Sequence, residues 1–169
     1  DVRNISGNYN ADTKKIEINA QIPQILYGKN ALENTSLVIT NHDQALQYNL
    51  YVDSYKGESF ALSKINVEGD VANNTVNYTI TSKNKDDVIQ FLIAGNAKSI
   101  HDVTEISLKP DGLKLNYSDW TVADNNKIQF SDKGILAENF KLSNSGSEIF
   151  IQSESPIPNS PLTISLKDF

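Results

Sequence analysis

Along most of this chain apolar and polar residues alternate, which restricts the local structure to strands with one apolar face. In residues 15–22, Ile16, Ile18, Ala20 and Ile22 share one parity, and mostly polar side chains occupy the other. Residues 46–52, LQYNLYV, repeat the pattern. Because successive side chains of a strand point to opposite faces, this period of two predicts strands that bury only one side.

Turn-forming residues separate these alternating runs, of which there are about twelve. Asn73-Asn74, Ser145-Gly146 and Pro110-Asp111-Gly112 suit tight turns, because Gly and Asn tolerate positive φ and Pro presets φ. Strands joined by such short connections pair antiparallel. The sequence therefore predicts an all-β, mostly antiparallel fold.

One segment departs from the alternation, KDDVIQFLIAGNAKSI at residues 85–100. Asp86 or Asp87 suits a helix N-cap, and Ile89, Leu92 and Ile93 follow the i, i+3, i+4 spacing of a helical stripe. Gly95 suits a helix end. We expect one short helix near residues 86–95.

An approximate internal repeat indicates how the sheet grows. ISLKPDGLKL, from Ile106, aligns with IQFSDKGILA, from Ile128, at an offset of about 22 residues, the length of two strands with their turns. Repetition on this scale favours a sheet that extends by adding strands. We therefore expect residues 1–169 to form a single β-repeat segment of a much longer chain.

Charge and composition disfavour several classes of function. The net charge is −6 and the pI about 4.8, so the clustered Lys and Arg that bind nucleic acid are not expected. The chain has no cysteine, which excludes disulfides and thiolate metal sites.

Residue patterns typical of catalysis or ion binding are also missing from the sequence. His42 and His101 each precede an Asp, but adjacent side chains in a strand or loop point apart and do not form a dyad. There is no Gly-rich phosphate loop, no G-x-S-x-G and no calcium-loop spacing. We expect no enzymatic activity, no cofactor and no metal.

The second half of the chain contains GILAENFKLSNSGSEIFIQSESPIPNSPLTISLKDF, with a Gly-hydrophobic step, an N-F-x-L strand, a small polar turn and an I-x-I-x strand. This pattern resembles the repeats of the TamB and AsmA-like family of large envelope proteins. The segment FALSKINVEGDVANNTVNYTI is similar in style. The resemblance covers most of the chain outside residues 86–95.

The resemblance implies a half-open sheet folded lengthwise like a taco, with an apolar concave face. Members of the family are anchored in the inner membrane, cross the periplasm and reach the outer membrane. They are associated with lipid transport between the two membranes and with outer-membrane protein assembly beside a TamA-like barrel. For this chain it implies a periplasmic location, an anchor in parts not in this chain, and phospholipid acyl chains or nascent outer-membrane strands as partners.

The candidate contact residues are the apolar members of the inward parity, whose side chains would shield acyl chains at about 0.8 kcal/mol per buried CH₂. In a closed sandwich the same residues would form an ordinary core. They are Leu46, Leu50, Ile65, Val67, Val76, Ile80, Ile106, Leu108, Leu113, Leu115, Ile128, Phe130, Phe140, Leu142, Ile149, Ile151, Ile164 and Leu166.

Two other functions fit the same pattern. A compact β-sandwich that binds carbohydrate would use Tyr27, Tyr51 or Tyr55, which lie off the apolar parity or in turns, as a stacking platform. A structural spacer of an envelope protein would need only a closed core.

Overall fold

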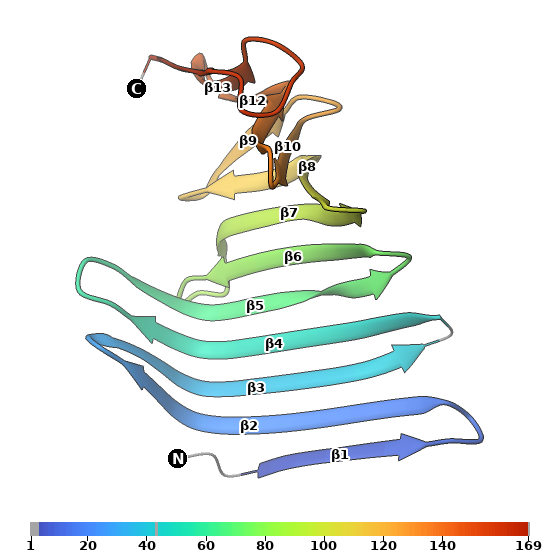
Figure 1. The fold of residues 1–169 in the computed structure, drawn as a ribbon. Coiled ribbons are helices and arrows are strands. Elements are labelled where there is room, and N and C mark those ends of the chain that lie inside the picture. Colours follow the sequence, from blue (N-terminus) through green and yellow to red (C-terminus); the bar gives the residue numbers. More distant parts are fainter. Residues whose placement is uncertain (1–3, 43, 169) are drawn as a thin grey trace. The chain divides into compact units, whose positions relative to one another are not determined.

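The computed structural model describes residues 4–42 and 44–168, and within these ranges it consists of strands and turns without a helix (Figure 1). Seven strands make up the first part: β1 (Asn4–Asn10), β2 (Lys15–Tyr27), β3 (Asn30–His42), β4 (Ala45–Lys56), β5 (Ala61–Ala72), β6 (Thr75–Lys83) and β7 (Ile89–Ile100). The remaining strands are β8 (Val103–Leu115), β9 (Ser118–Val122), β10 (Lys127–Ser131), β11 (Gly134–Glu138), β12 (Phe140–Asn144), β13 (Ser147–Ser153) and β14 (Leu162–Lys167).

The strands pair into an open antiparallel sheet, as the alternation predicted. Hydrogen-bonded neighbours follow chain order from β1 to β9 and continue through β12, β13 and β14, while β10 pairs with β8 and β11. The order ends at β1 and β14, so the sheet does not close into a barrel. The all-β class is therefore confirmed, with fourteen described strands instead of about twelve.

Contacts divide the chain into two compact units. The N-terminal unit comprises residues 1–72 and 78–91, and the C-terminal unit comprises residues 73–77 and 92–169.

In the N-terminal unit the strand register aligns apolar residues into rows across neighbouring strands. Leu37 lies opposite Ala20 and Leu50, and Leu50 lies opposite Val67. A second row runs through Ile18, Ile39 and Tyr48. The alternate positions carry mostly polar residues, for example the row Asn19, Val38, Asn49 and Glu68. One face of this unit is therefore apolar and the other largely polar.

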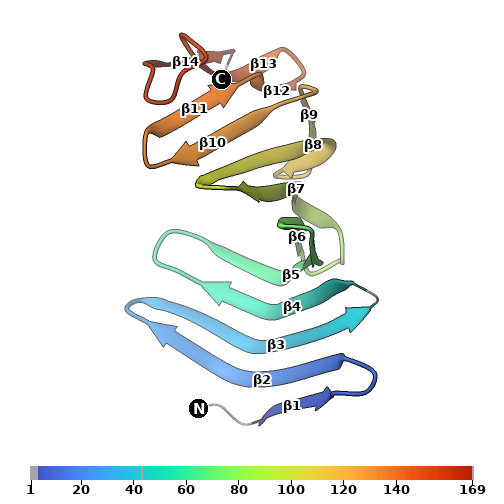
Figure 2. The same cartoon turned by 45° about the vertical axis from the view of Figure 1, so that its right-hand side comes forward.

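Strands β2 to β5 of this unit bend at the same place, as Figures 1 and 2 show. Regular pairing is interrupted on each strand at one position: Pro23, Asn34, Asp53 and Lys64. Asn34 and Lys64 have positive φ, 50° and 46°. A residue in the left-handed region breaks the alternation and turns the strand, as in a bulge. We call the longer part of each of these strands the long arm and the shorter part the short arm. The long arm comprises residues 15–22, 35–42, 45–52 and 65–72, and the short arm comprises residues 24–27, 30–33, 54–56 and 61–63.

The bend keeps apolar residues of both arms on the same side. The last long-arm row contains Ile22, Thr35, Val52 and Ile65, and the short-arm row contains Ile25, Leu32, Tyr55 and Leu62. Members of the two rows lie three residues apart on each strand, which plain alternation would put on opposite faces. The short-arm row is half-buried, whereas its neighbour Leu26 is 68% exposed. Both rows therefore face the inside of the bend.

The C-terminal unit bends by dividing its strands. Strand β8 pairs with β10 through residues 104–106 and with β9 through residues 113–115. Between these parts, residues 109–112 bulge opposite the single residue Ala94 of β7. Figure 2 shows the resulting pair β10 and β11 beside one another, while β9 continues through β12 and β13.

A small core holds this unit together. Leu113, Val122 and Leu142 are buried against one another, and Val122 is only 1% exposed. Trp120 and Ile149 are among the half-buried residues that pack against this cluster.

The prediction of a helix near residues 86–95 is wrong. Residues 89–100 form strand β7, and the polar residues before it form a turn in which Asn84 Oδ1 accepts the N–H groups of Asp86 and Val88 at 3.0 Å each. Asp87 has a φ of 62°, which interrupts a right-handed helix. Ile89, Phe91 and Ile93 also alternate, and this period decides the structure.

The prediction of a turn at Pro110-Asp111-Gly112 is also wrong, because these residues lie in the bulge inside β8. A Cβ on Gly112 would lie 2.6 Å from the carbonyl oxygen of Ala94, so only Gly permits this close approach. The turns at Asn73-Asn74 and Ser145-Gly146 are confirmed, with positive φ at all four residues.

Candidate apolar groove

The candidate site of the N-terminal unit is the apolar groove between its two arms. Its long-arm wall consists of the rows through Leu37, Leu50 and Val67 and through Ile18, Ile39 and Tyr48. Most of these side chains are half-buried, and Ile18 is 37% exposed. Neighbouring strands cover their flanks, but the outer surface of the face stays accessible. An apolar ligand can therefore contact a continuous face.

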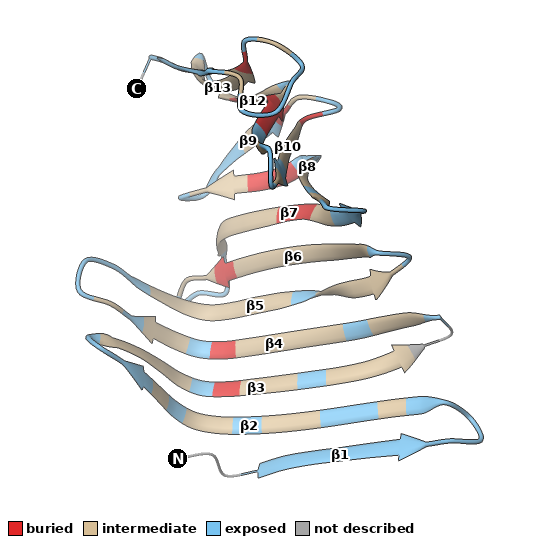
Figure 3. Cartoon of the chain, viewed as in Figure 1, coloured by how far each residue is buried: buried red, intermediate tan, exposed pale blue. Residues whose placement is uncertain are grey.

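Burial is deepest at the bend, where the two arms meet. Thr35 of β3 is 7% exposed and Val52 of β4 is 3% exposed. Figure 3 shows a buried segment, in red, at the bend of each of these two strands. Among the described residues of both units, just seven apolar residues are buried, namely Val52, Ala94, Leu113, Val122, Leu136, Ala137 and Leu142. The remaining apolar side chains are at least partly accessible to a ligand.

Most buried polar side chains form hydrogen bonds to backbone groups of another part of the chain. In the C-terminal unit Asn126, 4% exposed, accepts the N–H of Leu108 and donates to the carbonyls of Leu108 and Ala123, each at 2.8 Å. Ser153 Oγ, also 4% exposed, accepts the N–H of Ala137 at 3.0 Å. These bonds satisfy backbone groups that would otherwise be buried unpaired.

The N-terminal unit has one matching case. Ser82, 3% exposed, donates its Oγ hydrogen to the carbonyl of Ser63 at 2.9 Å, and Ser63 Oγ donates to the carbonyl of Lys83 at 2.8 Å. The buried Oγ1 of Thr35, by contrast, has no hydrogen-bond partner among residues 4–42 and 44–168.

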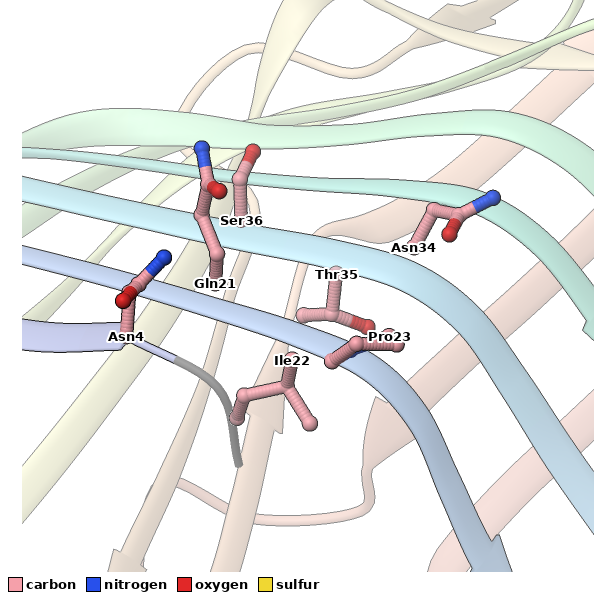
Figure 4. A pocket seen from close by; sticks show the side chains of 7 residues that line it. All are labelled: Asn4, Gln21, Ile22, Pro23, Asn34, Thr35 and Ser36. Carbon is pink, nitrogen blue, oxygen red and sulfur yellow. The ribbon is translucent and has the colours of Figure 1, made fainter. Parts of the chain in front are cut away.

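A hollow of about 340 Å³ lies beside Thr35 at the bend (Figure 4). Its described lining residues are Asn4, Gln21, Ile22, Pro23, Asn34, Thr35 and Ser36, and none of these is charged. Figure 4 shows the side chains of Thr35 and Ile22 on one side of the sheet and those of Asn4, Gln21, Asn34 and Ser36 on the other. The Thr35 hydroxyl points toward Pro23.

Two tyrosines bring hydroxyl groups to the apolar parity of the N-terminal unit. Burial raises the pKa of Tyr48, and the charge of Asp70 raises it further. Burial also raises the pKa of Tyr78, with a smaller contribution from Tyr48. Both phenols therefore remain neutral at physiological pH and add no charge to the face.

The predicted contact residues fall into both units. Leu46, Leu50, Ile65, Val67 and Ile80 belong to the N-terminal unit, and Val76 together with the twelve from Ile106 onward belongs to the C-terminal unit. Leu113 and Leu142 are core residues at 5% and 8% exposure. Phe130, Ile164 and Leu166 are exposed, at 40%, 64% and 65%, and the others are half-buried. The predicted contact residues are thus distributed over both units.

Sequence reasoning missed the short-arm wall, because Ile25, Leu32 and Leu62 change parity across the bend. The signal that could have located it is the pair Pro23 and Asn34, since Pro disrupts strand pairing and Asn tolerates positive φ.

The tyrosines named for carbohydrate binding do not converge as a set. Tyr55 packs on Phe60 with ring centroids 5.1 Å apart, and its hydroxyl donates to Asn30 Oδ1 at 2.7 Å. Tyr27 is 80% exposed at the end of β2, where it pairs with Asn30 of β3. Tyr51 lies on the opposite, polar parity, where it contacts Asp53. Tyr55 and Phe60 line a second hollow, of about 350 Å³, with Lys29, Asn30, Glu58 and Ser59.

The acidic residues and histidines were also compared with the geometry of a metal site. No group of three or more His, Asp or Glu residues is placed to hold a metal ion within the described part of the chain. His101 is exposed in the turn between β7 and β8 with a φ of 53°, and the side chain of His42 lies outside the described residues. Across residues 4–42 and 44–168, no helix has the length and apolarity to cross a bilayer.

The fold and the groove define the chain as an open antiparallel β-sheet protein with a bent, partly accessible apolar face. No protein-family model, curated protein or solved structure matches it.

Proposed function

We propose that this chain shields lipid acyl chains along the apolar face of its open sheet. The observation that carries the proposal is the set of aligned, half-buried apolar rows on both arms of the N-terminal unit. Burial of each CH₂ group of an acyl chain against such a face contributes about 0.8 kcal/mol. Because the rows carry few strong polar sites, an acyl chain can shift along them.

The setting of this activity follows from the family resemblance. In the proposal the chain is a periplasmic segment of a TamB-like protein that transfers lipid between the inner and outer membranes or guides nascent outer-membrane strands. Contact with a TamA-like barrel would be made by the full-length protein. Neither role requires bond chemistry in this chain.

Site-specific photo-crosslinking tests the proposal in cells. A crosslinking residue at Ile18 or Leu50 reports on the apolar face, and one at Asn19 or Asn49 reports on the opposite face of the same strands. We expect phospholipid adducts at the first pair and none at the second. Equal labelling of both pairs would contradict an acyl-chain groove.

A second candidate function is supported by the hollow beside Tyr55 and Phe60. Aromatic rings beside the polar side chains of Asn30 and Glu58 suit a saccharide, which offers both apolar ring faces and hydroxyl groups. Glycan-array binding that is lost in Phe60→Ala but kept in Phe130→Ala would support this function. Phe130 is an exposed Phe of the C-terminal unit and controls for loss of aromatic surface.

A further inference from the structure

We infer that the free edge of β1 pairs antiparallel with β1 of a second copy of this chain, so that two N-terminal units share one continuous sheet. The two copies are related by a two-fold axis at Gly7, and the pair is closed because each copy uses the same strand. The inference goes beyond the proposed function and does not depend on it.

Strand β1 is an edge without the features that prevent strand pairing. Within residues 4–42 and 44–168 its hydrogen-bonded neighbour is β2, and Figure 1 shows it at the end of the sheet of the N-terminal unit. Its seven residues, NISGNYN, include no charged residue and no proline, and their register with β2 is uninterrupted. All seven are exposed. Proteins protect such an edge with a charge, a proline, a bulge or a covering segment.

This chain does protect the free edge of another strand, β11. The N–H of Asn159 donates to the carbonyl of Ile135 at 3.1 Å, and Ser153 Oγ accepts the N–H of Ala137 at 3.0 Å. A loop and a side chain therefore occupy backbone groups that could otherwise bind another strand. Strand β14 is exposed like β1, but it carries Lys167, and a lysine on an edge disfavours pairing. Of these edges, β1 is the one best suited to accept a strand.

The sequence of β1 is complementary to itself in one antiparallel register. With Gly7 opposite Gly7 of the second copy, Ile5 lies opposite Tyr9 and Ser6 lies opposite Asn8. Ile5, Gly7 and Tyr9 lie opposite apolar residues of β2, so this register keeps the apolar side chains of both copies on one face. An aromatic residue opposite a β-branched one is a favourable cross-strand pair, and no like charges meet within the strand. A second copy of the same strand therefore fits the edge.

Gly7 itself indicates that another backbone approaches β1. A Cβ on Gly7 would lie 3.9 Å from both the carbonyl oxygen of Glu17 and Cγ1 of Ile18, which is an ordinary contact distance. Its φ is not in the left-handed region either, so nothing within one chain requires glycine at this position. Glycine inside a strand weakens the strand and often marks the close approach of another backbone. In the paired register, two glycines at the axis leave space for the Tyr9 rings of both copies.

Pairing would extend the apolar face of the N-terminal unit into the second copy. Ile5 and Tyr9 are 68% and 66% exposed in one chain, and each would gain a neighbour on its free flank. Backbone hydrogen bonds along seven residues supply most of the affinity, as in other strand additions. Because an interface of one strand is small, we expect a weak dimer that forms at about 10–100 µM.

Sedimentation velocity of the complete 169-residue chain at about 1–500 µM tests the inference. We expect a monomer at the low end and a dimer at the high end. Amide hydrogen exchange should then show protection of β1 that increases with protein concentration.

Two double variants test the register. Ser6→Lys/Asn8→Lys places lysines opposite lysines across the two-fold axis, so the dissociation constant should rise at least about 10-fold. Ser6→Glu/Asn8→Lys places glutamate opposite lysine instead and should restore the dimer. In its own chain, position 8 lies opposite Glu17 of β2, so a lysine there is compatible with the β1–β2 hairpin.

The matched control changes the other exposed edge. Thr163→Lys/Ser165→Lys introduces the same two charges on the polar parity of β14 and should leave the dimer unchanged. Far-UV circular dichroism of each variant should equal that of the wild type. If Ser6→Lys/Asn8→Lys fails this check, the comparison of Ser6→Glu/Asn8→Lys with the wild type still decides the register.

Several outcomes would overturn the inference. A wild type that stays monomeric up to the highest concentration would exclude the pairing, and growth beyond a dimer would exclude a closed two-fold pair. Loss of the dimer in the β14 variant but not in Ser6→Lys/Asn8→Lys would assign the contact to β14. Failure of Ser6→Glu/Asn8→Lys to dimerise would contradict the register at Gly7. No lipid is present in these experiments, so none of these results bears on the proposed function.

Discussion

Truncating two leucines of the same row measures directly whether the apolar face of the C-terminal unit is open. Leu142 and Leu166 both lie in register with Ile149, one on each side of it. Leu142 is 8% exposed and belongs to the core cluster, whereas Leu166, on β14, is 65% exposed. The same chemical change at the two positions therefore compares a core site with a face that solvent reaches.

The expected costs follow from these exposures. Leu→Ala removes three carbons, and burial of each contributes about 0.8 kcal/mol. At Leu142 nearly all of this transfer free energy is lost, and the cavity left among Leu113 and Val122 adds to it, which gives about 3–4 kcal/mol. At Leu166 only about one third of the side chain is buried and solvent fills the space, so the loss is about 1 kcal/mol.

Urea unfolding monitored by Trp120 fluorescence provides the measurement, because Trp120 is the only tryptophan and packs against the same cluster. The two variants should differ in unfolding free energy by about 2–3 kcal/mol at unchanged slope. Equal losses would refute the reasoning, since they would mean that the exposed face of β14 is covered in solution and that its residues form a core.

Three further predictions concern the bends and the polar face. Asn126→Ala should reduce the unfolding free energy by about 2–4 kcal/mol in the same urea assay, because the N–H and C=O of Leu108 lose their hydrogen bonds to this side chain. A loss below about 1 kcal/mol would contradict the role of Asn126 as their partner. Gly112→Ala should reduce the unfolding free energy by about 1–3 kcal/mol in thermal or urea unfolding, because the new Cβ would contact the Ala94 carbonyl oxygen. Gly146 has open space where a Cβ would lie, so Gly146→Ala should be destabilised only by the positive φ of that position. The hydrogen bond from Lys64 holds the pKa of Asp87 below its ordinary value. This ion pair therefore stabilises the fold at pH values above the ordinary pKa, and its contribution disappears as the pH falls through the lowered pKa. Carboxyl NMR titration should show a higher pKa of Asp87 in Lys64→Gln, and an unchanged pKa would rule out the pair.

The alternation of the sequence was sufficient to predict the class of fold and much of its apolar parity. Strands such as β4 follow it directly, because one face of each strand meets apolar neighbours across the register and the other meets polar ones. The residues 89–93 were misassigned because their apolar positions satisfy both periods over such a short run. What decided between them was the turn at Asn84 and Asp87, whose backbone hydrogen bonds and positive φ interrupt a helix before Ile89.

The bends were not predictable in the same way. Asn34 and Lys64 adopt positive φ inside strands, where Asn is tolerated and Lys gives no sequence signal at all. The bends at these residues place Ile25, Leu32 and Tyr55 on the groove side, although simple alternation along each strand would place them on the opposite face. The bulge in β8 was concealed for a related reason, because Pro-Asp-Gly is equally compatible with a hairpin turn and with an irregular strand.

These bends also explain how an open sheet can enclose a ligand without a second layer. A flat antiparallel sheet exposes its apolar face evenly, so no part of it offers a deep contact. Bending strands β2 to β5 at one column brings apolar rows of both arms to the inside of the bend, and Thr35 and Val52 are buried there. Where a bulge interrupts regular pairing, a side chain can supply the missing backbone hydrogen bonds, as Asn126 does for Leu108 beside the bulge of β8.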